Sequence, residues 1–309
     1  MTVTPTEKAG RLTGRTTRRR AAEAVIRTLI YTAGLLSIVI LLAIAVFLFV
    51  EARKSIAEVG LGTMLSGTQW FPTGTPRIFG FLPLIIGSLM VTGVALVVFV
   101  PVGIGAAVFI SEFSAGWFKE VMKSVIEFMA AVPSVVYGFL GVAVLIPWVK
   151  ATFGLTSGMT ALTGGLVLGV MSLPTVISIS EDALHAVPDA LRQGSLALGN
   201  TRWQTIYKVV VPSASSGIFA GVMLGLGRAI GETMAVLMLT GNAAVIPTNV
   251  FESVRTMTGT IAAEMGEVVF GGLHYSVLFS VGLVLFGITF TINLAADLVL
   301  ERQRKRWRR

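Results

Sequence analysis

The 309-residue chain contains no cysteine, only two histidines and few charged side chains. Without cysteine it has no disulfides, thiolate zinc sites, iron–sulfur clusters or cysteine nucleophiles. Charged residues make up 13% of the chain and hydrophobic residues 54%, with a mean hydropathy of +0.83. This balance excludes a water-soluble domain with a polar surface and indicates an integral membrane protein.

The sequence also lacks the motifs of an enzyme. It has no G-x-x-x-x-G-K-[ST] run, and therefore no phosphate-binding loop of its own for ATP. His185 and His274 are expected on opposite sides of the membrane, which argues against a shared metal site or an acid–base couple. No nucleophile motif or metal-ligand cluster is visible. We therefore expect no catalytic residue, no metal and no cofactor in this chain.

Six apolar stretches are long enough to cross a bilayer, because a hydrocarbon core of about 30 Å needs roughly 20 helical residues. They fall at residues 28–50, 81–110, 124–147, 161–180, 213–240 and 275–300. The first is too long for a signal peptide, and EARKS follows it where a small-residue cleavage site would stand, so we expect it to remain as an anchor. The pattern predicts an all-α membrane protein with six transmembrane helices.

Lys and Arg are distributed unevenly along the chain, whose formal net charge is +8. With the N-terminus inside, the inner segments hold 18 of the 24 basic residues and the outer ones hold 5, while Arg228 lies within the fifth stretch. Cytoplasmic loops retain positive charge, so both termini are predicted to be cytoplasmic. The basic tails 1–27 and 301–309 are expected to contact anionic lipids rather than nucleic acid. Residues 28–300 would form the transmembrane domain.

The inner segment 188–212, between the fourth and fifth stretches, is predicted to form two short helices joined at a glycine. Pro188 suits the first position of a helix that Gly199 ends. Thr201 and Gln204 have capping-box spacing and begin a second helix. The apolar residues at helical spacing after this cap are Trp203, Ile206, Tyr207 and Val210. Such a hairpin could fill a groove on a soluble partner or rest on the lipid.

Arg228 and Glu232 interrupt the fifth stretch, where a charge costs a few kcal/mol even on the most lenient insertion scale. Four residues apart on one helical face, they could neutralise each other and lock the helix against its neighbours. Alternatively, Arg228 meets an anion through its planar fork of donors, and Glu232 keeps that anion from binding too tightly. Charges inside a membrane favour the functional reading.

Other residues of the stretches predict kinks and close packing. Pro133 predicts a kink in the third stretch, and Ser134 and Tyr137 just after it are either further pathway residues or partners for the backbone groups that the proline frees. Small residues recur every four positions in the fifth stretch, where another helix can approach closely. They are Gly217, Gly221 and Gly225, followed by Gly227 and Gly231.

The inner hairpin resembles the coupling motif of ABC importer permeases, which reads EAA, three residues, Gly, nine residues and I-x-L-P. The glycine, the proline and both spacings match, whereas Gln-Gly-Ser replaces Glu-Ala-Ala and two valines fill the aliphatic positions. The resemblance implies that these residues couple the chain to an ATPase. They are Gln193, Gly194, Ser195, Gly199, Val209, Val211 and Pro212.

Four further segments extend this resemblance over roughly residues 25–300. They are ISEFSAGWFK (110–119), EFMAAVPSVVYGFLG (127–141), MLGLGRAIGETMAV (223–236) and GLHYSVLFSVGLVLFGITF (272–290). Together they resemble the PstC-type permease subunits of phosphate ABC importers. PstA-type subunits share the Arg-Ala-Ile-Gly-Glu-Thr core but are less similar beyond it, and sulfate and molybdate permeases share the Arg and Glu.

The resemblance implies a type I ABC importer permease fold in a bacterial or archaeal inner membrane. The expected partners are a PstA-like permease subunit in a heterodimer, a dimer of PstB-like ATPase subunits that use ATP, and a PstS-like phosphate-binding protein outside the cell. The binding protein would dock on the outer segments 51–80 and 241–274. A different class, a gradient-driven anion carrier or channel, remains open, although the inverted repeat typical of carriers is not visible.

Overall fold

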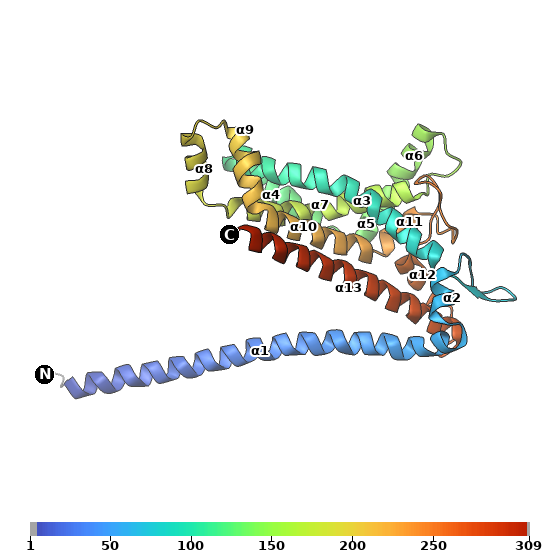
Figure 1. The fold of residues 1–309 in the computed structure, drawn as a ribbon, viewed down its shortest axis with the longest axis horizontal. Coiled ribbons are helices and arrows are strands. Elements are labelled where there is room, and N and C mark those ends of the chain that lie inside the picture. The colour runs from blue at the N-terminus through green and yellow to red at the C-terminus, as the bar shows by residue number, and fades with distance from the viewer. Residues whose placement is uncertain (1–4, 308–309) are drawn as a thin grey trace. The chain divides into compact units, whose positions relative to one another are not determined.

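The computed structural model describes the backbone of residues 5–307 and the side chains of residues 23–298 and 301. This part of the chain consists of helices and one two-stranded antiparallel hairpin (Figure 1). The chain divides after Glu51 into two units, which we describe separately.

The α-helices, in chain order, are α1 (Pro5–Glu58), α2 (Leu61–Ser66), α3 (Leu82–Val108), α4 (Gly116–Ala131), α5 (Ser134–Leu140), α6 (Ile146–Phe153), α7 (Ala161–His185), α8 (Asp189–Ala197), α9 (Arg202–Thr205), α10 (Val211–Gly231), α11 (Met234–Leu239), α12 (Met257–Glu264) and α13 (Leu273–Trp307). Three short π-helices interrupt them: η1 (Phe109–Phe113), η2 (Gly141–Leu145) and η3 (Ile206–Val210). The strands are β1 (Trp70–Phe71) and β2 (Ile78–Phe79).

The first unit consists of the N-terminal part of α1. Its described side chains, from residue 23 onward, are apolar and largely exposed, as expected of a helix that is surrounded by lipid or by another membrane protein. The backbone is helical from Pro5, so the helix of the first span extends through residues 5–27. The predicted lipid contacts of the tails fall on side chains outside the described residues.

Within the described residues, six helices are long and apolar enough to cross a membrane. They cover 23–58, 82–113, 134–153, 161–185, 202–231 and 273–298. Four agree with the predicted stretches apart from their ends, and the fifth prediction, 213–240, is wrong in its last part, because α10 ends at Gly231. The third prediction, 124–147, is wrong in its first part, because Val132 and Pro133 adopt an extended backbone that separates α4 from α5. Pro133 therefore breaks the helix instead of bending it, and the third span begins at Ser134.

The residues before this break belong to α4, which is held against α7 by charge. Glu181 of α7 has only 3% of its side chain exposed, and its Oε1 and Oε2 lie 2.9 and 2.7 Å from the Nζ atoms of Lys119 and Lys123. A buried carboxylate needs such partners. The amphipathic α4 is thus attached to the end of the fourth span.

The centre of the second unit is the packing of α3, α7 and α10 around a shared apolar core. A Cβ added to Gly217 would lie 2.3 Å from Ala183 Cβ, and one added to Gly225 would lie 2.6 Å from Val176 Cγ2. This confirms the close approach predicted for the first glycine series. The second series does not take part, since a Cβ on Gly227 or Gly231 meets nothing within 4 Å.

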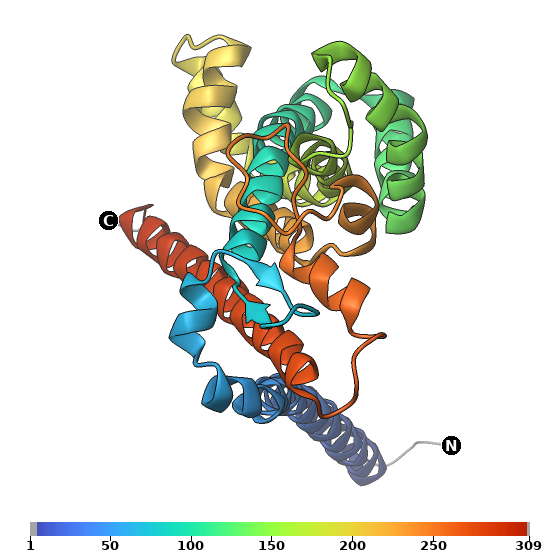
Figure 2. The same ribbon diagram turned by 90° about the vertical axis from the view of Figure 1, so that its right-hand side faces the viewer.

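The second unit has two differently built ends. The hairpin end carries α8 and α9, and the far end carries α2, α6, α12 and the β-hairpin (Figure 1). Figure 2 looks onto the far end. There Trp70 pairs with Phe79 across the two strands and packs into an apolar cluster with Leu84 and Met257.

Candidate functional site

The fifth span does not run unbroken through Arg228 and Glu232. Helix α10 ends at Gly231, and Glu232 has an extended backbone with φ −69° and ψ 134°. Its Oε1 accepts hydrogen bonds from the backbone N–H groups of Met234 (3.1 Å) and Ala235 (3.3 Å) at the start of α11. Among the described side chains, 23–298 and 301, Arg228 and Glu232 form no ion pair. The lock across one helical face, one of the two alternatives, does not form, because α10 ends at Gly231, before Glu232.

A second contact holds the break between α10 and α11. The Thr258 hydroxyl on α12 donates to the Glu232 carbonyl at 2.9 Å. Together with the two bonds to the Glu232 carboxylate, this contact satisfies part of the backbone at the break within the protein, as non-helical backbone at membrane depth requires. The Glu232 carboxylate thus accepts hydrogen bonds from the backbone of α11, and the Glu232 carbonyl accepts one from α12.

Arg228 has weak partners for a guanidinium group. Its Nη1 donates to Thr175 Oγ1 over 3.4 Å, a long hydrogen bond, and Thr175 lies near the middle of the fourth span on α7. A guanidinium carries five N–H donors and keeps its charge at every physiological pH. The site is therefore a cation in the last turn of α10, beside the middle of the fourth span, and most of its donors have no partner among the described residues. Sequence reasoning missed Thr175; the only signal was a hydroxyl beside Pro174 in an apolar run.

The structure also places the other two predicted pathway residues. In a regular helix the Met129 carbonyl would accept from residue 133, but Pro133 has no N–H. The Tyr137 hydroxyl donates to that carbonyl at 2.9 Å and so replaces the missing bond. Tyr137 also lies within electrostatic reach of Arg228. Ser134 begins α5 directly after the break.

Helices α5 and α11 approach each other closely. A Cβ on Gly138 would lie 2.9 Å from Met238 Sδ and 3.2 Å from Ala235 Cα. Both helices start at a break within a predicted stretch, one at Ser134 and the other at Met234. The helices that follow the breaks in the third and fifth predicted stretches therefore lie side by side.

The hairpin between the fourth and fifth spans has its predicted local geometry in most details. Helix α8 starts at Asp189, one residue after the predicted position, and is followed by Gly199 with φ +86°, a conformation that favours glycine. The capping box is confirmed: Gln204 N–H donates to Thr201 Oγ1 at 3.2 Å, and Thr201 N–H donates to Gln204 Oε1 at 2.8 Å.

The first three motif positions differ in their surroundings. Gln193 and Gly194 are exposed on α8, whereas Ser195 is buried inside the hairpin. The Ser195 and Thr205 hydroxyl oxygens lie 2.9 Å apart, and Asn200 Nδ2 donates to Ser195 Oγ at 3.1 Å. Ser195 therefore fastens α8 to α9.

The sequence predicted that the second hairpin helix would end before Pro212, but the helix continues past this residue. Helix α9 continues through η3 into α10, and Pro212 occupies the first turn of α10, where its missing N–H costs little. Val209 and Val211 lie on this continuous path, and the Val209 carbonyl accepts from Ser213 Oγ at 2.6 Å. The hairpin is thus joined directly to the span that carries Arg228.

Large apolar side chains are exposed on the hairpin. Leu198 is 86% exposed at its tip, and Trp203 is 60% exposed at the start of α9. An exposed apolar patch of this kind on a helical hairpin marks an interaction surface.

Six apolar spans, a cation beside the middle of the fourth span and an exposed helical hairpin at one end of the second unit are typical of a membrane transport permease. The chain belongs to the family described as the binding-protein-dependent transport system inner membrane component, whose model matches residues 99–309. It is accordingly a multi-pass protein of the cell inner membrane.

Curated relatives cover nearly the whole chain. The phosphate transport system permease proteins PstC of Mesorhizobium japonicum and Haemophilus influenzae are 34% and 33% identical to it, over 93% and 88% of this chain and 93% and 91% of their own lengths. YqgH of Bacillus subtilis, described as a probable ABC transporter permease protein, is 39% identical over 90% of this chain and 91% of its own. The predicted PstC-type resemblance is confirmed.

Solved structures share the fold at low sequence identity. The bacterial alginate ABC transporter in complex with its pentasaccharide-bound periplasmic protein matches with a TM-score of 0.63 at 15% identity, over 89% of this chain and 94% of its own. The inward-facing MetNI methionine ABC transporter matches with 0.55 at 19% identity, over 72% of this chain and 96% of its own. The predicted type I importer permease fold is confirmed.

Proposed function

We propose that this chain is the PstC-type permease subunit of an ATP-driven phosphate importer. The observation that carries the proposal is the likeness to permeases named for phosphate transport, which extends over about nine tenths of the chain and includes the spans that hold Arg228. A substrate of this class is a tetrahedral oxyanion, and a planar cationic fork suits its recognition.

In this proposal Arg228 contacts phosphate beside the middle of the fourth span, together with the Thr175 hydroxyl. Both groups come from tightly packed helices, so their spacing is well defined. Ser134 and Tyr137 lie along the same pathway, with the Tyr137 hydroxyl hydrogen already committed to the backbone. Transport requires that phosphate is bound and then released. A site whose available N–H donors all come from Arg228 permits both steps.

Glu232 acts in this proposal as a competitor that is held away from Arg228. Its carboxylate accepts two backbone N–H groups of α11 and leaves the guanidinium open to phosphate. To reach Arg228, it must give up those bonds. Glu232 exchanges these partners when the pathway, open on one side of the membrane, closes there and opens on the other. This exchange displaces the bound anion.

Each expected partner binds a different part of the second unit: the hairpin end, the side of α10 or the far end. A PstB-like ATPase dimer, which uses ATP, binds the hairpin 188–212 on the cytoplasmic side, through the exposed apolar tip and the motif positions on it. A PstA-like subunit completes the pathway beside α10, where Gly227 and Gly231 have open space. A PstS-like phosphate-binding protein delivers the substrate to the far end. Residues 28–300 form the permease domain, and the basic ends 1–27 and 301–309 contact anionic lipids.

The test is phosphate uptake by the reconstituted complex. The chain is assembled with a PstA-like subunit, the ATPase and the binding protein in proteoliposomes, and ATP-dependent uptake of labelled phosphate is measured. We expect uptake that requires ATP and disappears in Arg228→Ala while the subunits still assemble. Lys150→Ala, which removes an exposed basic side chain of α6 outside the segments 51–80 and 241–274, is the control and should transport normally.

Three outcomes would contradict parts of this proposal. Uptake without ATP or partners would assign the chain to a gradient-driven carrier or channel. Uptake of sulfate or molybdate in place of phosphate would show that the substrate is another oxyanion. Loss of assembly in Arg228→Ala would reduce Arg228 to a packing role.

A further inference from the structure

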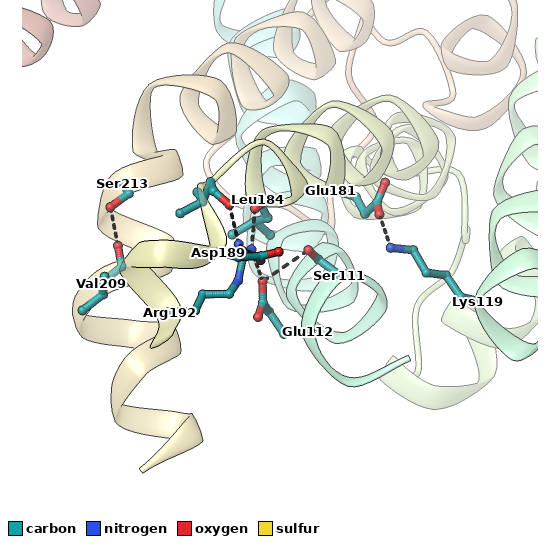
Figure 3. A network of polar contacts seen from close by, with 10 residues as sticks. Ser111, Glu112, Lys119, Glu181, Leu184, Asp189, Arg192, Val209 and Ser213 are labelled. Carbon is teal, nitrogen blue, oxygen red and sulfur yellow. Dashed lines mark hydrogen bonds and ion pairs between the residues drawn. The ribbon is translucent and has the colours of Figure 1, made fainter. Parts of the chain in front are cut away.

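Arg192 on α8 connects the hairpin to the ends of two spans (Figure 3). Its Nη2 donates to Glu112 Oε1 at 2.9 Å and to the Leu184 carbonyl at 2.8 Å. Its Nη1 donates to the Val187 carbonyl and to Asp189 Oδ1, the latter at 3.2 Å. One side chain thus makes contacts with α8 itself, with η1 at the end of α3, and with the end of α7 and the residues just after it.

These contacts are strong for their position in the molecule. The side chain of Arg192 is 19% exposed and that of Glu112 is 11% exposed, so their ion pair is largely shielded from water. Removing one partner of a shielded pair leaves an uncompensated charge, which is costly. The Leu184 carbonyl in the last turn of α7 already accepts from the Val187 N–H at 3.2 Å, and the guanidinium fork adds a further, charged donor.

A second contact joins the other half of the hairpin to the same place. The rings of Trp203 on α9 and Phe113 in η1 lie 6.5 Å apart between centroids. Phe113 directly follows Glu112, so both hairpin helices meet η1 at adjacent residues. The π-helical end of the second span is therefore a common anchor for α8 and α9.

The hairpin accordingly reaches the candidate phosphate site by two routes. One is the continuous path α9–η3–α10, whose α10 part covers about 26 Å between Val211 and Arg228 at 1.5 Å per residue. The other runs through Arg192 into α7, where Leu184 and Thr175 are about 14 Å apart on the same scale. The first route ends at Arg228 and the second at Thr175, and these two residues form the Arg228–Thr175 contact.

We propose that Arg192, through Glu112 and the end of α7, is a positioning residue that makes the second, fourth and fifth spans follow the hairpin as one rigid body. The inference rests on the proposed function, since it concerns how a movement imposed by the ATPase reaches the pathway. With Arg192 in place, a displaced hairpin carries α3, α7 and α10 together. Without it, α8 loses its side-chain contacts with η1 and the end of α7, less of the hairpin's displacement reaches these spans, and ATP is hydrolysed with less transport.

The experiment measures phosphate transported per ATP hydrolysed by the whole reconstituted complex. The variants are Arg192→Lys, which keeps the charge but not the fork, and Glu112→Gln, which keeps the shape but not the charge. Glu120→Gln, the same change at an exposed position on α4, is the control. We expect the ratio to fall at least tenfold in both variants, with ATP hydrolysis and assembly within twofold of the wild type, and to stay unchanged in the control.

The double variant separates a shared role from two independent ones. Because both residues act through one contact, Arg192→Lys combined with Glu112→Gln should lower the ratio no further than Arg192→Lys alone. If Arg192→Lys does not assemble, the isosteric Glu112→Gln decides the test by itself.

Two results would overturn the inference. One is an unchanged ratio in Glu112→Gln; the other is a parallel loss of hydrolysis and transport in the assembled variants, which would make Arg192 a docking or folding residue only. Absence of ATP-dependent phosphate uptake in the wild type would instead refute the proposed function, so the two failures are distinguishable.

Discussion

The contact between the fourth and fifth spans can be tested by adding a single methyl group. Gly217 and Gly227 lie on the same helix, α10, ten residues apart. Replacing either by alanine gives the helix the same gain of about 0.5–1 kcal/mol, because alanine loses less backbone entropy on folding than glycine. The surroundings differ, however, since the new methyl group meets Ala183 in one case and nothing within 4 Å in the other.

The cost at Gly217 follows from the distances. Carbon atoms approach favourably to about 3.5 Å, and the added Cβ would lie 2.3 Å from Ala183 Cβ, so α7 and α10 must separate locally by about 1.2 Å. Overpacking of a well-packed core costs about 1–3 kcal/mol. Gly217→Ala should therefore be less stable than Gly227→Ala by roughly that amount, while Gly227→Ala equals or exceeds the wild type.

The assay is thermal unfolding of the purified chain in detergent, with the two variants measured side by side. A difference of 1 kcal/mol corresponds to roughly 2–4 °C for chains of about 150–250 residues, and somewhat less for longer ones. We expect Gly217→Ala to unfold a few degrees below Gly227→Ala. Equal midpoints, or a lower midpoint for Gly227→Ala, would refute the reasoning that the first glycine series and not the second forms the helix contact.

Three further outcomes are expected. Tyr137→Phe leaves the Met129 carbonyl without its donor, which should cost about 1–3 kcal/mol of stability, seen as a lower unfolding midpoint. Glu232→Gln keeps an oxygen acceptor for α11 and should unfold like the wild type but release phosphate more slowly, whereas Glu232→Ala should lose about 1 kcal/mol of stability, as for a lost helix cap. The hydrogen bond to Glu181 raises the pKa of Lys123 above its ordinary 10.5, so its stabilisation is complete below that pH and disappears as pH rises through the higher folded-state value. Alkaline titration should consequently destabilise the wild type more than Lys123→Gln.

Features that depend on neighbouring residues could be predicted from the sequence. The capping box at Thr201 is one, since both hydrogen bonds join residues three apart. The glycine series that begins at Gly217 is another, because its period of four matches one face of a helix. The six spans follow from hydrophobic length alone, which is the strongest constraint that a membrane imposes.

Features that depend on distant residues could not be predicted in this way. The break at Glu232 is held partly by Thr258, 26 residues later in the chain, and no proline marks it. The partner of Arg192 in the further inference is Glu112, 80 residues away. Pro133 was recognised, but a proline alone does not decide between a bend and a break; the Tyr137 hydroxyl, which replaces the lost hydrogen bond, stabilises the break.

The π-helical turn η3 has a consequence for anyone who builds chimaeras of this permease. Such a turn corresponds to one residue inserted into an α-helix, and one residue amounts to about 100° of rotation at 3.6 residues per turn. Exchanging Ile206–Val210 for a regular α-helical segment one residue shorter would therefore keep the face that carries Trp203 at its present angle to Arg228, because the wider π-turn absorbs the rotation of the extra residue. The change of turn compensates for the deletion, so hairpins can be exchanged between permeases that differ by this one residue.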